Sequence, residues 1–300
     1  MKASHSTSAG ATGRLRAWLE LTRAPNVFTA VSNIVAAQFI VAQGLPEPVA
    51  LLLLCCASAC LYTGGIVLND CFDYAEDLAE RPSRPLPSGR ISRPIAFAVG
   101  LLLLLAGWGL AAAVGSLPAL LAAAVAAMVL CYDAWAKRTR LGPVAMAACR
   151  LGNWLLGLSS GGALATLWPL ALPPFVYIAS LTVLSRSETQ GGDRRPVLVC
   201  AAGMLLCLLL LLAYHAIGLV HNALGLLLLG GGAVLVGLRL HRTWQDFVPA
   251  NIQRSVKFLV LGVIPFDALI VFAAGPWWGA LVVVALLLPG VLIARRIYVT

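Results

Sequence analysis

A dense cluster of carboxylates follows a long uncharged stretch of the chain. More than twenty residues without a charge precede five acidic residues within eleven positions: Asp70, Asp73, Glu76, Asp77 and Glu80. If the preceding helix continues through this cluster, Asp70, Asp73 and Asp77 lie on one face over two turns. Like charges at this spacing repel one another, so we expect a cation to compensate them. Mg²⁺ is the candidate, because it prefers oxygen ligands from a few carboxylates together with substrate phosphates.

A solvated, charged helix end at a membrane boundary is the alternative interpretation of this cluster. Two features favour a metal and phosphate site instead. The acids on the shared face are all aspartates, and a second polar stretch, SRSETQGGD at 185–193, lies elsewhere in the chain. Three arginines also follow the acids at once, at Arg81, Arg84 and Arg90.

The composition places these residues in a membrane protein. Hydrophobic residues make up 60% of the 300-residue chain, charged residues 11%, and the mean hydropathy is +0.91. A soluble protein of this length could not cover its surface with so few charges. Uncharged apolar runs of about twenty residues are candidates for transmembrane helices. The sequence therefore predicts an all-α, polytopic transmembrane helical bundle of nine to ten spans.

The apolar runs and the turn residues between them define ten candidate spans. They cover residues 25–43, 47–68, 94–114, 117–135, 143–161, 165–184, 197–216, 220–238, 257–274 and 277–294. The last two could instead form one span and a re-entrant segment. We treat residues 1–20 as a cytoplasmic N-terminal tail, disordered and then running into a short interfacial helix. Residues 21–300 form a single transmembrane domain.

The basic residues indicate how the spans are oriented. The connections after the odd-numbered spans contain no Lys or Arg, and Arg150 is the one basic residue well inside a span. By the positive-inside rule, both termini, the acidic cluster and the basic loops face the cytoplasm of a bacterial-type inner membrane. The net charge of +9 then reflects topology, so we expect no nucleic-acid partner. Eight cysteines, mostly in apolar segments and without a CxxC pair, predict neither disulfides nor a zinc site.

Several motifs resemble one family in order along the chain. The stretch Asn69-Asp70-x-x-Asp73-x-x-x-Asp77, followed by RPLPSG, is similar to the first aspartate-rich motif of the UbiA superfamily of intramembrane prenyltransferases. Further matches are Arg23-Ala24-Pro25-Asn26, Tyr132 with Lys137 and Arg138, and Arg150-x-x-Asn153. The resemblance covers about residues 20 to 200. LSRSETQGG and the tenth span are similar to the EboC-like branch of the family.

The resemblance implies a fold, a reaction and roles for these residues. A helical bundle would surround a central, lipid-accessible cavity, in which a UbiA-like prenyltransferase moves a prenyl group from an allylic polyprenyl diphosphate to a small acceptor. That acceptor would be aromatic or otherwise lipophilic. Asp70, Asp73 and Asp77 would act in catalysis and hold Mg²⁺ against the diphosphate. The substrate-binding residues would be Arg23, Asn69, Tyr132, Lys137, Arg138, Arg150 and Asn153.

The second aspartate-rich motif of the family is altered here. Glu188 is the single acid in the expected window after the sixth span, Asp193 comes five residues later, and Ser185 stands where an aspartate is expected. Glu188 and Asp193 are the candidate ligands for further metal. Because a hydroxyl carries no formal charge, a second Mg²⁺ would bind more weakly or not at all.

Three hypotheses remain at this point. The chain could be an enzyme with an altered second site, an enzyme for a different lipid, or a non-catalytic protein that binds or transports an isoprenoid phosphate in the same cavity. Alcohol phosphotransferases of phospholipid synthesis, which also use intramembrane aspartates, are disfavoured because their DG-x-x-AR pattern is absent. Asp267, an acid inside the ninth span, is expected to be structural or cavity-lining, with Lys257 as a conceivable partner.

Overall fold

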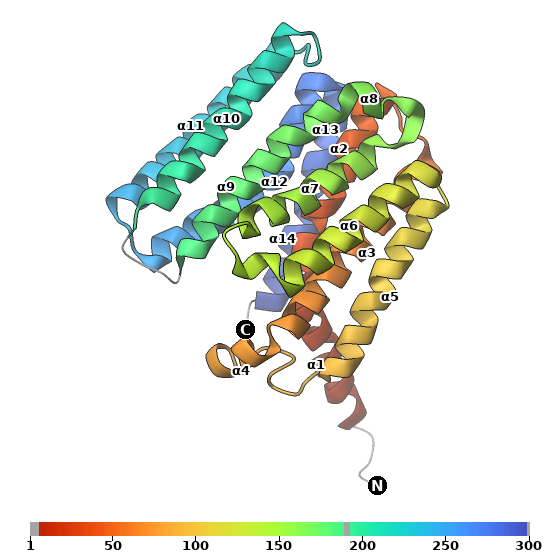
Figure 1. Ribbon diagram of the computed structural model, residues 1–300, viewed down its shortest axis with the longest axis vertical. Helices are drawn as coiled ribbons and strands as arrows, with labels where there is room; N and C mark the ends of the chain where they lie inside the picture. Colours follow the sequence, from red (N-terminus) through yellow and green to blue (C-terminus); the bar gives the residue numbers. More distant parts are fainter. Residues whose placement is uncertain (1–5, 189–192, 299–300) are drawn as a thin grey trace.

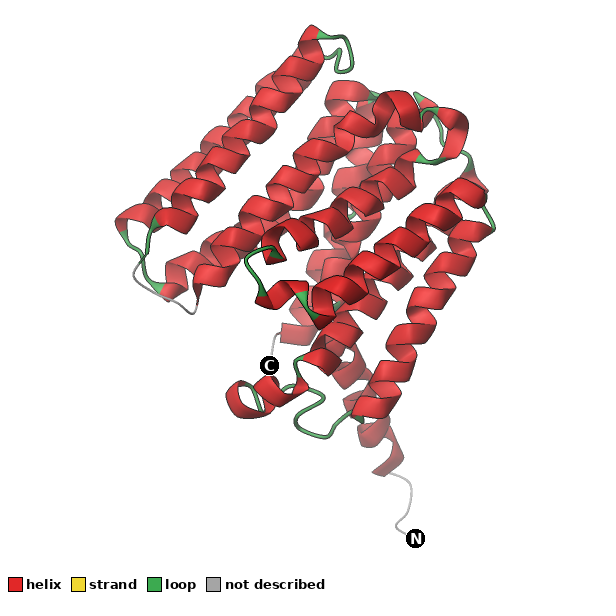
Figure 2. Cartoon of the chain, viewed as in Figure 1, coloured by secondary structure: helices red, strands yellow, loops and turns green. Residues whose placement is uncertain are grey.

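The computed structural model describes residues 6–188 and 193–298, and within them it contains helices and loops but no strand (Figure 2). The α-helices are α1 Ser6–Leu21, α2 Phe28–Ala42, α3 Pro48–Phe72, α4 Tyr74–Glu80, α5 Arg93–Ala112, α6 Ser116–Ala134, α7 Gly142–Leu158, α8 Leu164–Leu167, α9 Leu172–Ser185, α10 Arg195–Ala216, α11 Ala223–Gln245, α12 Pro249–Ala274, α13 Trp277–Ala285 and α14 Leu287–Tyr298. Short 3₁₀ turns are η1 Ala24–Val27, η2 Ala136–Arg138, η3 Ser160–Gly162, η4 Trp168–Ala171 and η5 Arg186–Glu188.

The long helices run side by side as a bundle (Figure 1). Over the described residues, nine segments are long and apolar enough to cross a membrane: η1 with α2, α3, α5, α6, α8 with α9, α10, α11, α12, and α13 with α14. The 17-residue α7 is a tenth long helix of the bundle and packs against α2, α6 and α9. The predicted all-α bundle of nine to ten spans is therefore confirmed.

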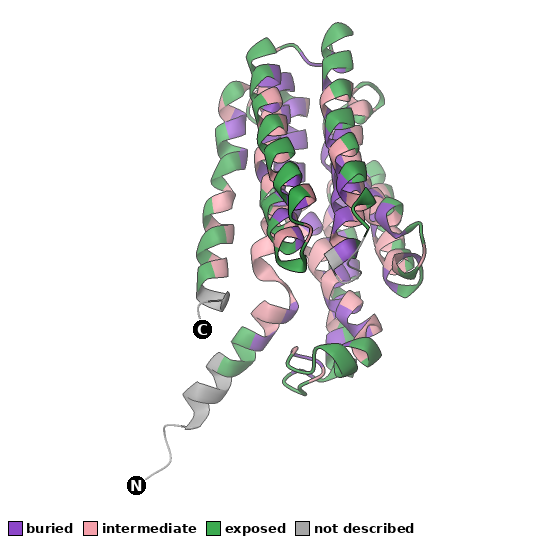
Figure 3. Cartoon of the chain, turned by 90° about the vertical axis from the view of Figure 1, so that its left-hand side faces the viewer, coloured by how far each residue is buried: buried purple, intermediate pink, exposed green. Residues whose placement is uncertain are grey.

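The bundle packs closely where small residues meet. Gly64 of α3 and Gly100 of α5 face each other, and a Cβ on Gly64 would come within 2.9 Å of the Gly100 carbonyl oxygen. Helices in membranes associate through such small residues, because close backbone approach replaces the missing hydrophobic driving force. Buried residues line the inner sides of the helices, whereas exposed residues cover the outer sides (Figure 3). Many of these exposed side chains are leucine and valine, as a lipid-facing surface requires.

The sequence predicts an N-terminal disordered tail that runs into a short interfacial helix, and within the described residues the N-terminal segment is helical from Ser6 onward. Helix α1 begins at Ser6 and ends at Leu21, and its Ala17 and Leu21 side chains are fully buried. They pack in one cluster with Val67 and Cys71 of α3 and with Leu86 of the following loop. Helix α1 is thus attached to the end of the bundle that carries the acidic cluster.

The C-terminal part contains two segments long and apolar enough to span a membrane, rather than one span and a re-entrant segment. Helix α12 extends from Pro249, eight residues before the predicted start, and α13 and α14 together form the last span. Helix α13 packs against α12 and α2, and α14 contacts η1. As a result, α1, α4 and the end of α14 lie at the same end of the bundle (Figure 1).

Candidate active site

The acidic cluster lies at a break between two helices. Helix α3 ends at Phe72, and Asp73, with φ −87° and ψ 4°, precedes the short α4. The backbone bonds Asp73 N to Asn69 O and Asp77 N to Asp73 O still continue across the break, at 3.0 Å and 2.9 Å. The condition for one shared face, an uninterrupted helix, is therefore not met, and the side-chain contacts divide the three aspartates into two groups.

Asp70 and Asp77 form the first group, around Arg84. The Arg84 Nη1 atom donates to Asp77 Oδ2 at 2.7 Å and lies 3.8 Å from Asp70 Oδ1. Arg23 Nη2 donates to the same Asp70 oxygen at 3.1 Å, and Arg81 lies 3.6 Å from Asp77. Because both carboxylates are almost fully buried, they need these cations to offset their desolvation. The arginine-rich loop after α4 thus folds back to neutralise the cluster.

Asp73 faces the other way, toward the connection between α6 and α7. Lys137 Nζ forms an ion pair with Asp73 Oδ1 at 2.7 Å, and Arg138 Nη2 lies 3.8 Å from the same oxygen. These groups border a polar cavity of about 220 Å³. Its lining residues are Asp73, Glu76, Tyr132, Lys137, Arg138, Gly142, Thr182, Ser185 and Arg186. We call it the polar pocket.

A buried aspartate that sequence reasoning missed adjoins this site. Asn69 Nδ2 donates to Asp133 Oδ1 at 2.7 Å, so the predicted substrate-binding Asn69 holds a carboxylate of α6. Asp133 is 2% exposed, and its Oδ2 atom is buried without a hydrogen-bond partner. The signal that could have revealed it is its place near the end of a predicted span, since an ionisable residue in a membrane helix is a functional candidate by default.

Arg150 and Asn153 belong to a different, internal network. Arg150 Nη1 donates to Asn33 Oδ1 at 2.7 Å, and Asn33 Nδ2 donates to Asp267 Oδ2 at 2.7 Å. Asn153 Nδ2 bonds the same Asn33 oxygen at 3.1 Å, and Ser32 Oγ donates to Asp267 at 2.5 Å. The network joins α2, α7 and α12. The structure therefore does not bring Arg150 and Asn153 to the acidic cluster, and Asp267 is bonded by Ser32 and Asn33 rather than by Lys257.

The region of the second motif places a cation, and among the described residues no carboxylate, at the polar pocket. Arg186, directly after α9, lines the polar pocket together with Ser185. Asp193 is exposed and accepts a hydrogen bond from Arg195 N at 2.9 Å, at the start of α10. The Glu188 side chain lies outside the described residues, so its predicted role as a ligand stays a prediction.

The donor atoms of the acidic cluster fit Mg²⁺ in kind. Within residues 6–188 and 193–298, no three His, Cys, Asp or Glu side chains are grouped so as to hold a metal by themselves. Mg²⁺ usually takes only one or two carboxylates and completes its shell with water and substrate phosphates. Asp70 and Asp77 share Arg84, Asp73 faces the polar pocket, and Asp133 carries a buried oxygen without a partner. This set of hard oxygen atoms suits a magnesium ion that a phosphate ligand brings with it.

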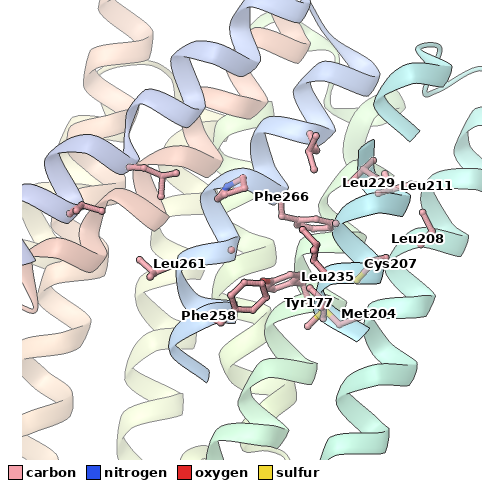
Figure 4. A pocket seen from close by; sticks show the side chains of 18 residues that line it. Tyr177, Met204, Cys207, Leu208, Leu211, Leu229, Leu235, Phe258, Leu261 and Phe266 are labelled. Carbon is pink, nitrogen blue, oxygen red and sulfur yellow. The ribbon is translucent and has the colours of Figure 1, made fainter. Parts of the chain in front are cut away.

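A second, apolar cavity of about 490 Å³ lies among α9, α10, α11, α12 and α14. Figure 4 shows that Tyr177, Met204, Phe258 and Phe266 extend toward a shared space. Its further lining consists of leucine, valine, glycine and other apolar residues, so it suits hydrocarbon rather than a charged group. Helix α9 contributes Tyr177 to this apolar cavity and Ser185 to the polar pocket.

Comparison with known families shows to which protein family the chain belongs. Residues 30–261 match the UbiA prenyltransferase family. The chain belongs to that family. The resemblance of the motifs between Arg23 and Asn153 is thereby confirmed at the level of the family, while the EboC-like branch stays a prediction.

The relatives of this chain include enzymes named digeranylgeranylglyceryl phosphate synthase. The digeranylgeranylglyceryl phosphate synthase of Ignicoccus hospitalis is 31% identical over 188 residues, which cover 61% of this chain and 60% of that enzyme. The enzyme of the same name from Methanoregula boonei is 34% identical over 189 residues, covering 60% of this chain and 65% of the relative. The chain thus matches less than two thirds of the length of these relatives.

Solved structures share the UbiA fold with this chain. A structure of digeranylgeranylglyceryl phosphate synthase superposes with a TM-score of 0.68 at 20% identity, covering 87% of this chain and 99% of that one. A UbiA homolog from Archaeoglobus fulgidus bound to DMAPP and Mg²⁺ superposes with a TM-score of 0.66 at 12% identity, covering 89% and 99%. At such identities the likeness establishes the fold, which agrees with an integral, multi-pass membrane protein.

Proposed function

We propose that this chain transfers a prenyl group from an allylic prenyl diphosphate to a small lipophilic acceptor within the membrane. One observation carries the proposal. Asp70, Asp73 and Asp77 gather with Arg23, Arg84 and Lys137 at one end of an apolar bundle. Such a site suits a ligand with a strongly charged head and a hydrocarbon tail, which is the chemistry of a prenyl diphosphate.

The basic residues would promote cleavage of the donor. When the allylic carbon–oxygen bond breaks, its electron pair leaves with the diphosphate, and the prenyl group becomes an allylic cation. Lys137 and Arg138 next to Asp73 would stabilise the negative charge that develops on the leaving diphosphate. The acceptor then forms a bond to the cationic carbon and loses a proton.

Asp70, Asp73 and Asp77 would bind Mg²⁺ together with the diphosphate. The bound metal would supply positive charge to the phosphate oxygens. Arg23, Arg84 and Lys137, which pair with these aspartates, would then be released to contact phosphate. Asn69 would position the neighbouring carboxylate of Asp133 rather than bind the metal directly.

The names of the relatives favour a particular acceptor. Digeranylgeranylglyceryl phosphate synthases are named for a product with two geranylgeranyl groups on a glyceryl phosphate. A glyceryl phosphate lipid is therefore a better candidate acceptor for this chain than an aromatic compound. Such an acceptor brings a second phosphate to a site that already carries several cations.

A non-catalytic isoprenoid-phosphate carrier is the second candidate, because described carboxylates of the second motif do not reach the polar pocket. Membership of the family and the clustered first motif support the enzyme over the carrier. In either case we propose that the acidic end of the bundle faces the cytoplasm, since the Lys- and Arg-bearing connections lie at that end.

The decisive experiment uses the purified protein in lipid nanodiscs. It would be supplied with labelled geranylgeranyl diphosphate, Mg²⁺, and either a geranylgeranylglyceryl phosphate or an aromatic acceptor. We expect a prenylated glyceryl phosphate to form with the wild type, and to be lost with Asp73→Ala and after removal of Mg²⁺ with EDTA. Donor binding without turnover on any acceptor would favour the carrier. If Asp70, Asp73 and Asp77 could each be neutralised without changing binding or turnover, the proposal would be wrong.

A further inference from the structure

An arginine occupies the place where the sequence pattern leads one to expect a second acidic ligand set. Arg186 directly follows α9, next to Ser185. Asp73 and Glu76 of the first motif region line the same polar pocket. A site built for a second divalent cation would not place a fixed positive charge at this position, because the two charges would repel.

The Arg186 side chain is held in place from one side. Its Nη2 atom donates to the Lys137 carbonyl oxygen at 2.8 Å, so the guanidinium lies over the connection between α6 and α7. Gly142, the first residue of α7, makes room for it, since a Cβ there would lie 3.2 Å from Arg186 Nη1. A guanidinium has five N–H donors, and the Lys137 carbonyl engages one nitrogen. Among the described residues, the guanidinium donates one hydrogen bond, to the Lys137 carbonyl oxygen, so its other donors can serve a ligand in the pocket.

The charges around the polar pocket favour an anion. Three cationic side chains line it, Lys137, Arg138 and Arg186, against the two carboxylates Asp73 and Glu76. The hydroxyl groups of Thr182 and Ser185 also border it, but each donates its proton to a backbone carbonyl oxygen, of Ile178 and Thr182 respectively, so the three cations are the groups that attract an anion. At about 220 Å³ the pocket is smaller than the roughly 300–1,000 Å³ typical of sites for drug-sized ligands. It therefore suits a headgroup rather than a whole lipid.

We propose that the polar pocket binds a phosphate group through Arg186, whose fixed charge takes the part that a divalent cation on a second acidic motif would otherwise play. The inference deepens the proposed function, on which the identity of the phosphate depends. The phosphate belongs either to the diphosphate of the prenyl donor or to a glyceryl phosphate acceptor. A planar guanidinium can hold two oxygens of one phosphate with two parallel N–H···O bonds in a fixed fork, whereas an ammonium group acts as a point charge.

The test measures binding rather than turnover. Inorganic pyrophosphate and glycerol phosphate would each be titrated by calorimetry into the nanodisc-embedded protein, at low ionic strength, with and without Mg²⁺. Arg186→Gln should weaken the binding of at least one of them roughly 10- to 100-fold, the effect of losing one or two charge-assisted hydrogen bonds. Arg186→Lys should recover only part of that loss, because it restores the charge but not the fork.

Arg140→Gln provides the matched control. Arg140 is exposed on the same connection and does not line the polar pocket, so its substitution removes the same charge from the same end of the bundle. Binding should stay within about twofold of the wild type, as expected for a surface charge. If Arg186→Gln and Arg140→Gln weaken binding equally, or if neither does, the assignment of Arg186 is overturned.

The two probes separate the sources of the phosphate and separate this inference from the proposed function. Selective loss of pyrophosphate binding assigns Arg186 to the donor, and selective loss of glycerol phosphate binding assigns it to the acceptor. Anion binding that depends on Arg186, in a protein without prenyl transfer, would refute the proposed function and leave this inference standing. Prenyl transfer by the wild type, together with unaltered anion binding in Arg186→Gln, would support the proposed function and refute this inference.

Discussion

Lys137 Nζ lies 2.7 Å from Asp73 Oδ1, and this contact joins the connection between α6 and α7 to the break between α3 and α4. The two residues are 64 positions apart in the sequence (137 − 73). The Lys137 nitrogen is buried, and an ammonium group has three N–H donors, so it can contact a ligand in addition to Asp73. Asp73 therefore holds the ammonium group beside the polar pocket until a phosphate arrives.

We expect Lys137→Met to lower kcat for prenyl transfer by roughly 10²–10³, the loss seen when one group that stabilises a developing negative charge is removed. Asp73 would keep its place, because Arg138 remains within 3.8 Å of it. Steady-state kinetics with varied donor concentration measures the effect. Lys257→Met, an exposed lysine of α12, is the matched control and should retain wild-type kcat. Equal rates for both variants would refute the role of Lys137.

Arg84 is predicted to stabilise the fold as well as the site. Asp77 is 2% exposed, so Arg84→Gln would leave its carboxylate buried with only the longer contact to Arg81. We expect a loss of about 1–3 kcal/mol in the free energy of unfolding, because a hydrogen bond to a charged group is removed. Thermal unfolding in detergent would measure it. The double variant Arg84→Gln with Asp77→Asn should recover part of the loss, and a failure to recover would point to packing instead.

Asp133→Asn tests the buried carboxylate beside Asn69. The substitution keeps the shape, and the new amide oxygen can still accept from Asn69 Nδ2. We expect an unchanged melting temperature but at least about tenfold lower turnover or Mg²⁺ affinity, the usual cost of losing a group that orients metal ligands. Magnesium titration of activity, with size-exclusion profiles to confirm folding, is the measurement. Wild-type magnesium dependence would assign Asp133 to structure alone.

The fold could be predicted from hydropathy because backbone groups in lipid must be bonded internally, which leaves long apolar helices as the natural solution. The acidic residues could be predicted as a site because charged groups next to a membrane span are energetically costly, so a cluster of them indicates a function. The break at Asp73 was not predictable, because no glycine or proline marks it between Asn69 and Asp77.

Contacts between distant segments explain the remaining differences. Asp133 meets Asn69 only because α6 packs beside α3. Asp267 is bonded by Asn33, which lies 234 positions away, and not by the nearby Lys257. Periodicity within one helix contains no information about such pairs, so Arg150 could not be placed in the internal network from its motif.

Asp267 is expected to stabilise the bundle without acting in catalysis. Its carboxylate is fully buried and accepts from Ser32 and Asn33, and Asn33 in turn accepts from Arg150. Asp267→Ala would leave these donors and the arginine uncompensated, at a cost of about 3 kcal/mol. A lower melting temperature, with normal turnover per folded molecule below it, is the expected result. Lost turnover at an unchanged melting temperature would instead place this network in the reaction.

The apolar cavity predicts which donors the protein uses. Gly232 of α11 lines it, and a Cβ there would have only Leu269 within 4 Å, at 3.9 Å. Gly232→Phe should therefore extend into the cavity and displace the hydrocarbon chain that we expect it to hold. Turnover with a C20 donor should fall at least about tenfold relative to a C5 donor, because several buried CH₂ groups, each contributing ~0.8 kcal/mol, lose their site.

The neighbouring glycine gives a matched control for this last change. Gly231 is exposed, does not line the cavity, and a Cβ there would meet nothing within 4 Å. Gly231→Phe thus adds the same aromatic group and also replaces a glycine of α11. Its phenyl ring, however, points away from the cavity. Competition between C5 and C20 donors should give the wild-type ratio for Gly231→Phe and a shifted ratio for Gly232→Phe. Identical ratios for the two variants would mean that the prenyl chain lies elsewhere in the bundle.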